Sequence, residues 1–423
     1  MDNIFAKLYG DHKGIIKYQR SRYRHIFNKF QELFPESEAE VQFYSTPGRT
    51  EIGGNHTDHN HGRVLAAGVD LDSVAAATKS GDSIITVHSR GYEDPFIVDT
   101  YDLEIKDGEK RTTNALIRGI AARFKDLDYK IGGFNAYISS DVLGGSGLSS
   151  SASIEVLFGT ILNHLYNEGK MGAELLAIIG QYAENVYFDK PSGLMDQIAC
   201  AVGGFVSIDF KDPLKPIVKE IKFDFEDQDY QLLIVNTGGN HADLTDDYAS
   251  IPIEMMKVAN VFDKNVCREL TKSELLKNIG SLREKTGDRA VLRAMHFFDE
   301  DNRVILQTKA LEKGRFDEFL SLVKESGNSS WKLLQNCFTT HNPEEQGITL
   351  GLAITEDYIN KIGKGACRIH GGGFAGTIQV FLPDQKVAEY IKVIESVFGV
   401  GSVTKLGIRS LGTIRLDMNG SDI

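Results

Sequence analysis

The sequence predicts an α+β protein with two lobes, because the chain is long and its pattern changes near residue 205. A chain of 423 residues can form two or three domains, each with its own core. The first half mixes short alternating apolar runs, typical of strands, with amphipathic helical segments. The second half has strand patterns at both ends and helical patterns over residues 250–345. We therefore expect an N-terminal domain with a mixed sheet over residues 1–205 and a C-terminal domain over residues 206–423.

Charge and composition restrict the kinds of partner the protein can have. The net charge of −12 argues against a nucleic-acid partner, because binding to a phosphate backbone needs clustered Lys and Arg. There is no run of about 18 apolar residues and no signal peptide, which predicts a cytoplasmic protein without a membrane partner. Four widely spaced cysteines without a CxxC pair predict reduced thiols: Cys200, Cys267, Cys337 and Cys367.

Apolar periodicity predicts the individual elements. Residues 1–40 predict amphipathic helices that pack against the core. Apolar runs predict strands over residues 41–45, 64–70, 74–78, 83–89, 133–139, 205–209, 230–237 and 377–382. Helical spacing predicts helices over residues 114–124, 154–162 and 173–187, before the long helices of the second half.

The segment LGGSGLSSSAS, residues 143–153, predicts a phosphate-binding loop between a strand and a helix. Glycines let the backbone approach an anion, and the helix N-terminus offers free N–H groups with a partial positive charge. The serines add donors to phosphate oxygens and one oxygen ligand for a hard cation. The alternative is a simple turn whose last serine caps the helix, but that explains one serine rather than three. The segment lacks the Gly-Lys-Ser/Thr ending of a Walker A loop.

Two further segments carry candidate functional side chains. The segment TPGRTEIGGNHTDHNHG, residues 46–62, predicts a dense polar turn of the kind that holds sugar hydroxyls. Its three histidines also suggest zinc, although their spacing fits no strong ligand motif. Asp196 follows the breaker pair Pro191 and Gly193 and precedes an apolar run, which puts it at the end of an element. Such a position suits a catalytic carboxylate, and equally a helix cap.

Four segments, in this order, resemble the galactokinase branch of the GHMP small-molecule kinases. They are the signature segment of residues 47–58, the loop GSGLSSSA of residues 145–152, the block of residues 183–197 that ends in PSGLMDQ, and the turn GGGFAG of residues 371–376. The resemblance spans almost the whole chain. It implies the two-lobed GHMP kinase fold, with an N-terminal mixed-sheet lobe that carries the ATP loop and a C-terminal ferredoxin-like α/β-sandwich lobe.

The resemblance implies transfer of the γ-phosphoryl group of ATP, with Mg²⁺, to the C1 hydroxyl of galactose, giving α-galactose 1-phosphate. Asp196 would face this hydroxyl as general base or orienter, and Arg49 would hold Asp196 ionised. The implied sugar-binding residues are Asn55, His56, Asp58, Gly193 and Tyr248. Metal-associated positions are Ser151 and Glu184. The implied ATP-binding residues are Gly145, Ser146, Gly147, Leu148, Ser149, Ser150 and Ser151.

Departures from the family pattern concern the sugar. Galactokinases usually have Asn and Glu at the positions of Glu51 and Asn55, and Tyr at that of His59. An amide at position 55 would remove a negative charge near C6 of the sugar. This favours, as an alternative, a C1 kinase for a related hexose or a uronic acid such as galacturonate. A second alternative is a non-catalytic galactose sensor, but such a protein should lose part of the serine loop or Asp196, and both are present. We expect a monomer or a weak homo-oligomer.

Overall fold

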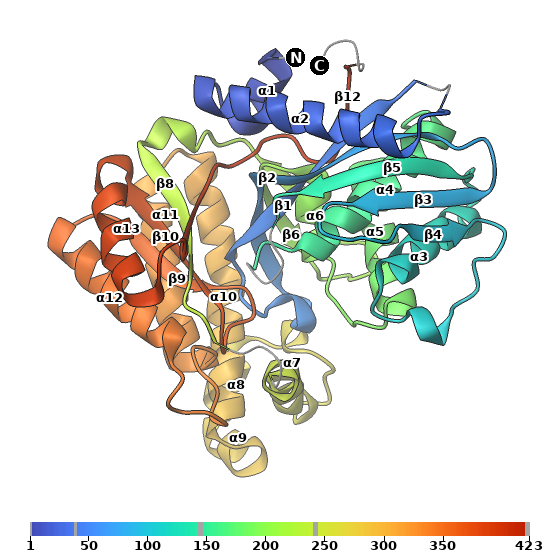
Figure 1. Cartoon of the computed structure of the whole chain (residues 1–423). Helices are drawn as coiled ribbons and strands as arrows, with labels where there is room; N and C mark the ends of the chain where they lie inside the picture. The colour runs from blue at the N-terminus through green and yellow to red at the C-terminus, as the bar shows by residue number, and fades with distance from the viewer. Residues whose placement is uncertain (1, 38–39, 143–146, 240–243, 419–423) are drawn as a thin grey trace.

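The structure, a computed structural model, describes residues 2–37, 40–142, 147–239 and 244–418. The chain forms two lobes, each built around its own β-sheet (Figure 1). The α+β class, the two lobes and the mixed first sheet agree with the sequence prediction. No helix in these described ranges combines the length and the apolar character that crossing a membrane requires.

The first lobe holds an eight-stranded sheet. Its strands are β1 (Gln42–Gly53), β2 (Arg63–Lys79), β3 (Ile84–Ser89), β4 (Phe96–Asp99), β5 (Phe134–Ser140), β6 (Phe205–Asp209), β7 (Ile217–Ile221) and β12 (Ile414–Leu416). The main order is β12-β1-β2-β5-β3-β4, and β6 joins β2 and β7. Only β3 and β5 pair in parallel among these strands, so the sheet is mixed.

Helices cover both faces of this sheet, because alternate residues of its strands are apolar on opposite sides. One face packs on α1 (Asp2–Tyr9) and α2 (Lys13–Leu33), through side chains such as Val74 and Ala76. The other packs mainly on α3 (Thr113–Asp126), α4 (Ser150–Asn167) and α5 (Ala173–Tyr182), through Ala75 and Ala77. Helix α6 (Met195–Val202) packs beside α4 and α5. The phosphate loop therefore opens a helix buried against the sheet.

The second lobe is a four-stranded antiparallel sheet in the order β11-β8-β10-β9. Its strands are β8 (Tyr230–Asn236), β9 (Ala366–His370), β10 (Thr377–Pro383) and β11 (Val403–Leu406). Leu233 and Val235 face α12 (Gly347–Ile362) and α13 (Asp384–Phe398). Leu232 and Ile234 face α10 (Asp288–Glu312), α11 (Phe316–Ser329) and the first lobe. The other helices are α7 (Thr245–Asn260), α8 (Lys272–Lys277) and α9 (Ile279–Thr286).

The β1–β2 hairpin differs from the sequence prediction and connects the lobes. Residues 46–53 continue β1 as a strand, with register shifts at Pro47/Arg49 and Glu51/Gly53, so only residues 54–62 form the polar turn. The strands expected over residues 64–70 and 74–78 are one long strand, β2. The prediction was wrong here because pairing with β2 satisfies the backbone of a segment whose polar composition suggested a loop.

The boundary expected near residue 205 lies in front of β6, which still pairs with β2. The chain enters the second sheet only at β8 and returns to the first sheet with β12, next to β1. The division into residues 1–205 and 206–423 stays a prediction, and the strand pairing favours a first lobe that also includes β6, β7 and β12.

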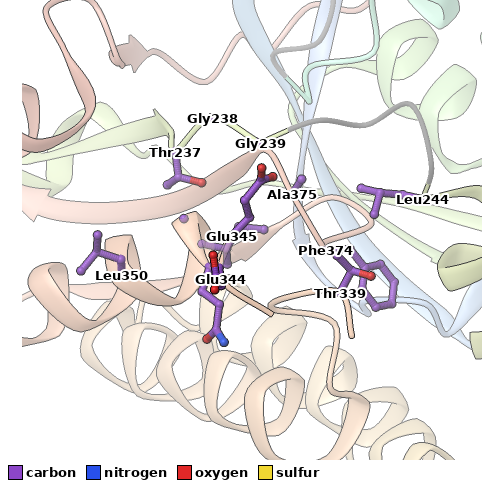
Figure 2. Close-up of a pocket in the computed structure, with 13 residues that line it drawn as sticks. Thr237, Gly238, Gly239, Leu244, Thr339, Glu344, Glu345, Leu350, Phe374 and Ala375 are labelled. Atoms are coloured by element: carbon purple, nitrogen blue, oxygen red, sulfur yellow. The ribbon is translucent and has the colours of Figure 1, made fainter. Parts of the chain in front are cut away.

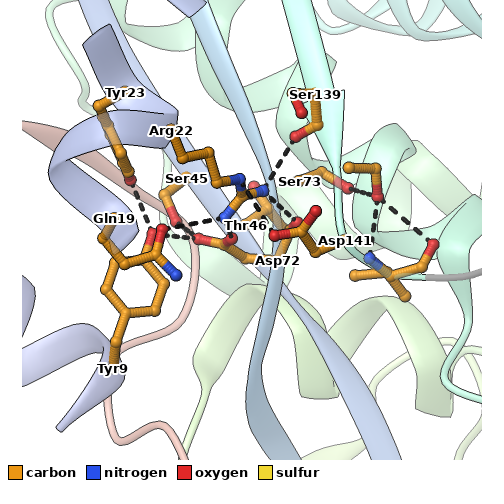
Figure 3. Close-up of polar contacts among 12 residues, drawn as sticks. Tyr9, Gln19, Arg22, Tyr23, Ser45, Thr46, Asp72, Ser73, Ser139 and Asp141 are labelled. Carbon is orange, nitrogen blue, oxygen red and sulfur yellow. Dashed lines mark hydrogen bonds and ion pairs between the residues drawn. The ribbon is translucent and has the colours of Figure 1, made fainter. Parts of the chain in front are cut away.

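A buried ionic cluster ties the N-terminal helices to the sheet of the first lobe (Figure 3). Asp72 on β2 is fully buried between Arg22 of α2, at 2.6 Å, and Arg409, at 2.9 Å. It also accepts hydrogen bonds from the Tyr9 and Ser45 hydroxyls. We call Asp72, Arg22, Arg409, Tyr9 and Ser45 the Asp72 cluster. Its carboxylate is satisfied entirely by protein groups, which points to a structural role.

Candidate active site

Asp196 and Arg49 form the centre of the site. Asp196 lies in the first turn of α6, and Arg49 lies on β1. The guanidinium donates from Nε to Oδ1 and from Nη2 to Oδ2, both at 2.7 Å, a two-pronged charge-assisted pair. Burial alone would raise the pKa of Asp196, but Arg49 and the Ser149 hydroxyl together hold this pKa below its usual value. Asp196 is therefore ionised at neutral pH, as the sequence predicts.

Arg49 also joins β1 to the end of the phosphate loop. Its backbone N–H donates to the Leu148 carbonyl at 3.0 Å, and Nη1 donates to the Gly147 carbonyl. The strand passes so close that a Cβ at Gly48 would lie 3.0 Å from the Leu148 oxygen. Glycine at position 48 therefore allows the strand and the loop to touch.

The phosphate loop leads directly into α4. Predicted ATP-binding residues Gly145 and Ser146 lie outside the described residues, whereas Gly147 to Ser151 are described. Ser149 adopts a left-handed conformation (φ +57°), and α4 begins at Ser150 with no acidic residue in its first turn. This helix end offers unpaired N–H groups next to two serine hydroxyls, which is the arrangement that holds phosphate.

Glu184 lies beside this helix end on a π-helical turn, Ala183–Tyr187, that follows α5. Its side chain is 2% exposed and lies with Oε1 3.3 Å from the Ser151 hydroxyl and 2.6 Å from Lys190 Nζ. The other oxygen, Oε2, accepts hydrogen bonds from Ser192 Oγ at 2.5 Å and Gln197 Nε2 at 2.9 Å. The two residues predicted to bind metal are thus in contact.

The residues present fit magnesium bound together with a nucleotide. Within the described part of the chain, no group of three or more His, Cys, Asp or Glu could hold a metal alone. One hydroxyl and one carboxylate, from Ser151 and Glu184, are the protein share typical of Mg²⁺ that also takes phosphate oxygens and waters. The zinc alternative loses support, because His56 Nε2 lies against the Gly372 carbonyl at 2.8 Å.

Glu155 and Lys190 belong to the hydrogen-bond network of Glu184, and sequence reasoning missed both. Gln197 bridges Glu155 and Glu184 with 2.9 Å hydrogen bonds from one amide nitrogen, while Glu155 Oε1 is buried without a partner. Burial, and then the charge of Glu184, raise the pKa of Glu155 well above its usual value. Glu155 lies four residues after Ser151 on the same helix, a spacing that could have indicated it.

A cavity of about 660 Å³ extends from Arg49 and Asp196 to the second lobe. Its lining includes the predicted residues Asn55, His56, Asp58, Gly193 and Tyr248, and also Glu51, His59, Arg111 and Lys190. A Cβ at Gly193 would lie 2.5 Å from Asp58 Oδ2, so position 193 must be small for Asp58 to keep its place. Tyr248 donates to the Gly373 carbonyl at 3.0 Å, which closes the cavity on the side of the second lobe.

Asn55 borders the cavity, but both ends of its amide have protein partners. Its Nδ2 donates to Glu51 Oε1 at 3.0 Å and to the Gly371 carbonyl at 2.8 Å, and its Oδ1 accepts from Asn336 at 2.9 Å. Glu51 in turn pairs with the fully buried Arg368 at 2.7 Å. The prediction that Asn55 contacts sugar remains a prediction. A carboxylate is present at the hydrogen-bonded neighbour Glu51, but burial raises the pKa of Glu51, and Arg368 pairs with it.

A second cavity, of about 610 Å³, lies in the second lobe between the end of β8 and the start of α12 (Figure 2). Residues lining it include Thr237, Gly239, Leu350 and the exposed carboxylates Glu344 and Glu345. Arg49 and Asp196 line the other cavity instead. No Lys or Arg stands among the described residues that line this second cavity, whereas Arg49, Arg111 and Lys190 line the cavity with Asp196, so we place the site there.

Comparison with known proteins shows which family the chain resembles. A model of the GHMP kinases N terminal domain matches residues 115–204, and a model of the galactokinase galactose-binding signature matches residues 28–79. Galactokinase from Streptomyces coelicolor is 28% identical over 386 residues, which cover 89% of this chain and 93% of that protein. The chain is therefore similar to the GHMP kinases in both matched segments. Its relatives here are galactokinases, which agrees with the resemblance of the sequence motifs.

Solved structures agree with this assignment. The structure of Lactococcus lactis galactokinase complexed with galactose superposes with a TM-score of 0.77 at 26% identity, covering 92% of this chain and 98% of that one. Mevalonate kinase from Methanococcus jannaschii has a TM-score of 0.61 at 17% identity, covering 88% and 99% of the two chains. The second match shows the fold alone. The predicted GHMP kinase fold is confirmed.

Proposed function

We propose that the protein is a galactokinase, which transfers the γ-phosphoryl group of ATP to the C1 hydroxyl of galactose. The observation that carries this proposal is the two-pronged pair of Arg49 and Asp196 beside the N-terminus of α4, in a cavity between the lobes. Galactokinase relatives that align over about nine-tenths of the chain support the choice of galactose.

The chain's own groups account for the transfer. The first turn of α4 and the serines from Ser149 to Ser151 bind the phosphates, while the cavity beside Asp58 and Gly193 holds the sugar. The bond from the C1 oxygen to the γ-phosphorus forms, and the bond from that phosphorus to the bridging oxygen breaks, so ADP leaves. The hydroxyl proton passes to Asp196.

Asp196 acts mainly by orienting the hydroxyl. A carboxylate whose pKa is held below its usual value is a weak base towards an alcohol in the ground state. The hydroxyl becomes acidic as its oxygen bonds to phosphorus, so the proton moves late, which suits the loose transition state of phosphoryl transfer. Ser151 and Glu184 would hold magnesium, which supplies neutralisation of phosphate charge when bound.

The geometry of Asn55 weakens the case for an acidic sugar, because protein groups bind both ends of its amide. A non-catalytic sensor is disfavoured by the intact pair of Arg49 and Asp196. The predictions of a cytoplasmic protein and of a monomer or weak homo-oligomer remain part of this proposal.

A substrate panel tests the proposal. Purified protein with ATP and Mg²⁺ would be assayed against galactose, glucose, galacturonate and other hexoses, with the phosphosugar identified by ³¹P NMR. We expect galactose to have the highest kcat/KM and to give α-galactose 1-phosphate. A higher kcat/KM for galacturonate would assign the uronic-acid activity instead, and no turnover of any sugar would refute the kinase proposal.

A further inference from the structure

Lys190 occupies a position in the active-site cavity that no family motif assigned. It lies between Asp189, which has a left-handed backbone (φ +65°), and Pro191. The Lys190 backbone N–H donates to the Glu184 carbonyl at 3.1 Å. This tight turn directs the lysine back towards Glu184, and its side chain lines the cavity with Arg49 and Asp196.

The ammonium group of Lys190 lies next to the predicted phosphate position. Its Nζ is 2.6 Å from Glu184 Oε1, and the hydroxyl of Ser151 approaches the same oxygen at 3.3 Å. Ser151 belongs to the first turn of α4, whose free N–H groups face the nucleotide phosphates in our proposal. The cation and the phosphate-binding helix end therefore meet at one carboxylate oxygen.

Glu184 does not depend on Lys190 for its hydrogen bonds. Ser192 and Gln197 already donate to its other oxygen. The lysine side chain keeps 55% of its surface exposed, so two of its three ammonium protons can reach a ligand in the cavity. Solvent screens the half-exposed ammonium, which reduces what its pairing with the buried Glu184 contributes to stability.

Arg49 is poorly placed to neutralise the charge of the nucleotide phosphates. Its side chain is 9% exposed, and its three nitrogens are used by Asp196, Gly147 and Ser149. Charge on the transferring phosphoryl group spreads over three oxygens, and positioned cations lower the barrier by neutralising it. In the described lining of the cavity, Lys190 is the cation that both contacts the metal-side carboxylate and retains free donors.

We propose that Lys190 is a catalytic residue that binds the γ-phosphate of the nucleotide and neutralises its charge during transfer. This inference rests on the proposed kinase function. The lysine keeps its own proton throughout: the phosphorus exchanges the bridging oxygen of ADP for the sugar oxygen, and the ammonium donates hydrogen bonds to the non-bridging oxygens.

Binding of two nucleotides to Lys190→Met tests the inference without relying on turnover. Calorimetry with Mg²⁺ would compare ADP with the non-hydrolysable triphosphate AMP-PNP. We expect the variant to bind AMP-PNP about tenfold more weakly, because one charge-assisted contact is lost, with ADP changed less than about twofold. We also expect kcat to fall about 100-fold, and Lys190→Arg to recover part of both losses.

Lys219→Met provides a matched control. Lys219 pairs with Glu312 at 2.5 Å and is 58% exposed, but lies on β7, outside the residues that line the cavity. This variant should leave both nucleotide affinities and kcat unchanged. Equal weakening of ADP and AMP-PNP in Lys190→Met, or no change in either, would overturn the inference. If the wild-type protein phosphorylates no sugar, the proposed function fails, and the nucleotide comparison still decides the role of Lys190.

Discussion

Asp72 and Asp196 are both paired with arginine, but their surroundings differ in one respect. Asp72 is 0% exposed, and all its partners are protein groups: two arginines, a tyrosine and a serine. Asp196 keeps 29% of its side-chain surface exposed, on a cavity of about 660 Å³. In both cases burial opposes ionisation and arginine restores it.

The difference teaches where a buried charge can serve catalysis. A carboxylate whose lone pairs are all taken by protein groups can hold elements together but cannot accept a new hydrogen bond. Asp196 has one face held by Arg49 and another open to a ligand, so it can orient a hydroxyl. The Asp72 cluster instead fixes α2 and the segment around Arg409 against the sheet from which the phosphate loop departs.

The largest expected effect is on catalysis, in Asp196→Asn. An amide still accepts one hydrogen bond from Arg49 but neither carries charge nor takes the proton, so kcat should fall about 1,000-fold. Galactose affinity measured by calorimetry should change little, and the free energy of unfolding by less than about 2 kcal/mol. A kcat close to the wild-type value would remove Asp196 from the mechanism.

The matched change in the closed cluster, Asp72→Asn, should affect stability instead. The buried Arg409 would lose its counter-charge and Arg22 would keep only Asp141, at 3.2 Å, which costs about 3–5 kcal/mol in urea unfolding at neutral pH. Because the pKa of Asp72 is lowered in the folded state, its contribution is present above the unfolded pKa of about 4 and is lost as the pH falls below it. The variant should lack that acid-dependent loss, while kcat per folded molecule stays within about threefold of wild type. A free energy of unfolding equal to that of the wild type would show that the charge of Asp72 is not needed for stability.

Gly193→Ala tests the part of the open cavity that is proposed to bind the sugar. The new Cβ would lie 2.5 Å from Asp58 Oδ2, so the carboxylate must rotate away. We expect KM for galactose to rise about tenfold, with a smaller change in KM for ATP. Gly280→Ala, whose Cβ meets no atom within 4 Å, is the control and should leave both constants unchanged. An equal rise in both KM values would place the damage outside the sugar pocket.

The smallest effect is expected for Glu155→Gln, which replaces the buried oxygen that has no partner. The pKa of Glu155 is higher in the folded state than in the unfolded state. The contribution of Glu155 to the free energy of unfolding is therefore complete below the unfolded pKa, and it falls as the pH rises towards the folded pKa. The amide should remove that decline. The free energy of unfolding of the variant at pH 8 should therefore equal that of the wild type or exceed it by up to about 1 kcal/mol. A loss of stability at pH 8 would show that the ionised carboxylate is needed.

Local patterns predicted the parts of the site that lie within one segment. The serine loop ahead of α4 and Asp196 at an element end followed from short motifs, and the two-sheet α+β fold followed from apolar periodicity. These features depend on neighbours in the chain, so the sequence displays them directly. The contact of Arg49 with Asp196, which are 147 positions apart, followed only from the family resemblance.

Features that depend on distant partners were missed. Asn55 is held by Asn336 and Gly371, which lie about 300 residues away, so its orientation could not be inferred from the signature segment. Residues 46–53 looked like a loop, because the apolar strand with which they pair follows the turn. No role was predicted for Lys190, because its partner Glu184 lies on a π-helical turn, which has no clear sequence signal.

The most direct test of the central claim is kcat for Asp196→Asn with galactose and ATP at saturation, measured beside Asp72→Asn at a temperature where both variants are folded. The account predicts a loss of about 1,000-fold in the first variant and less than about threefold in the second. Equal losses of kcat in the two folded variants would contradict the assignment of catalysis to the open carboxylate and of structure to the closed one.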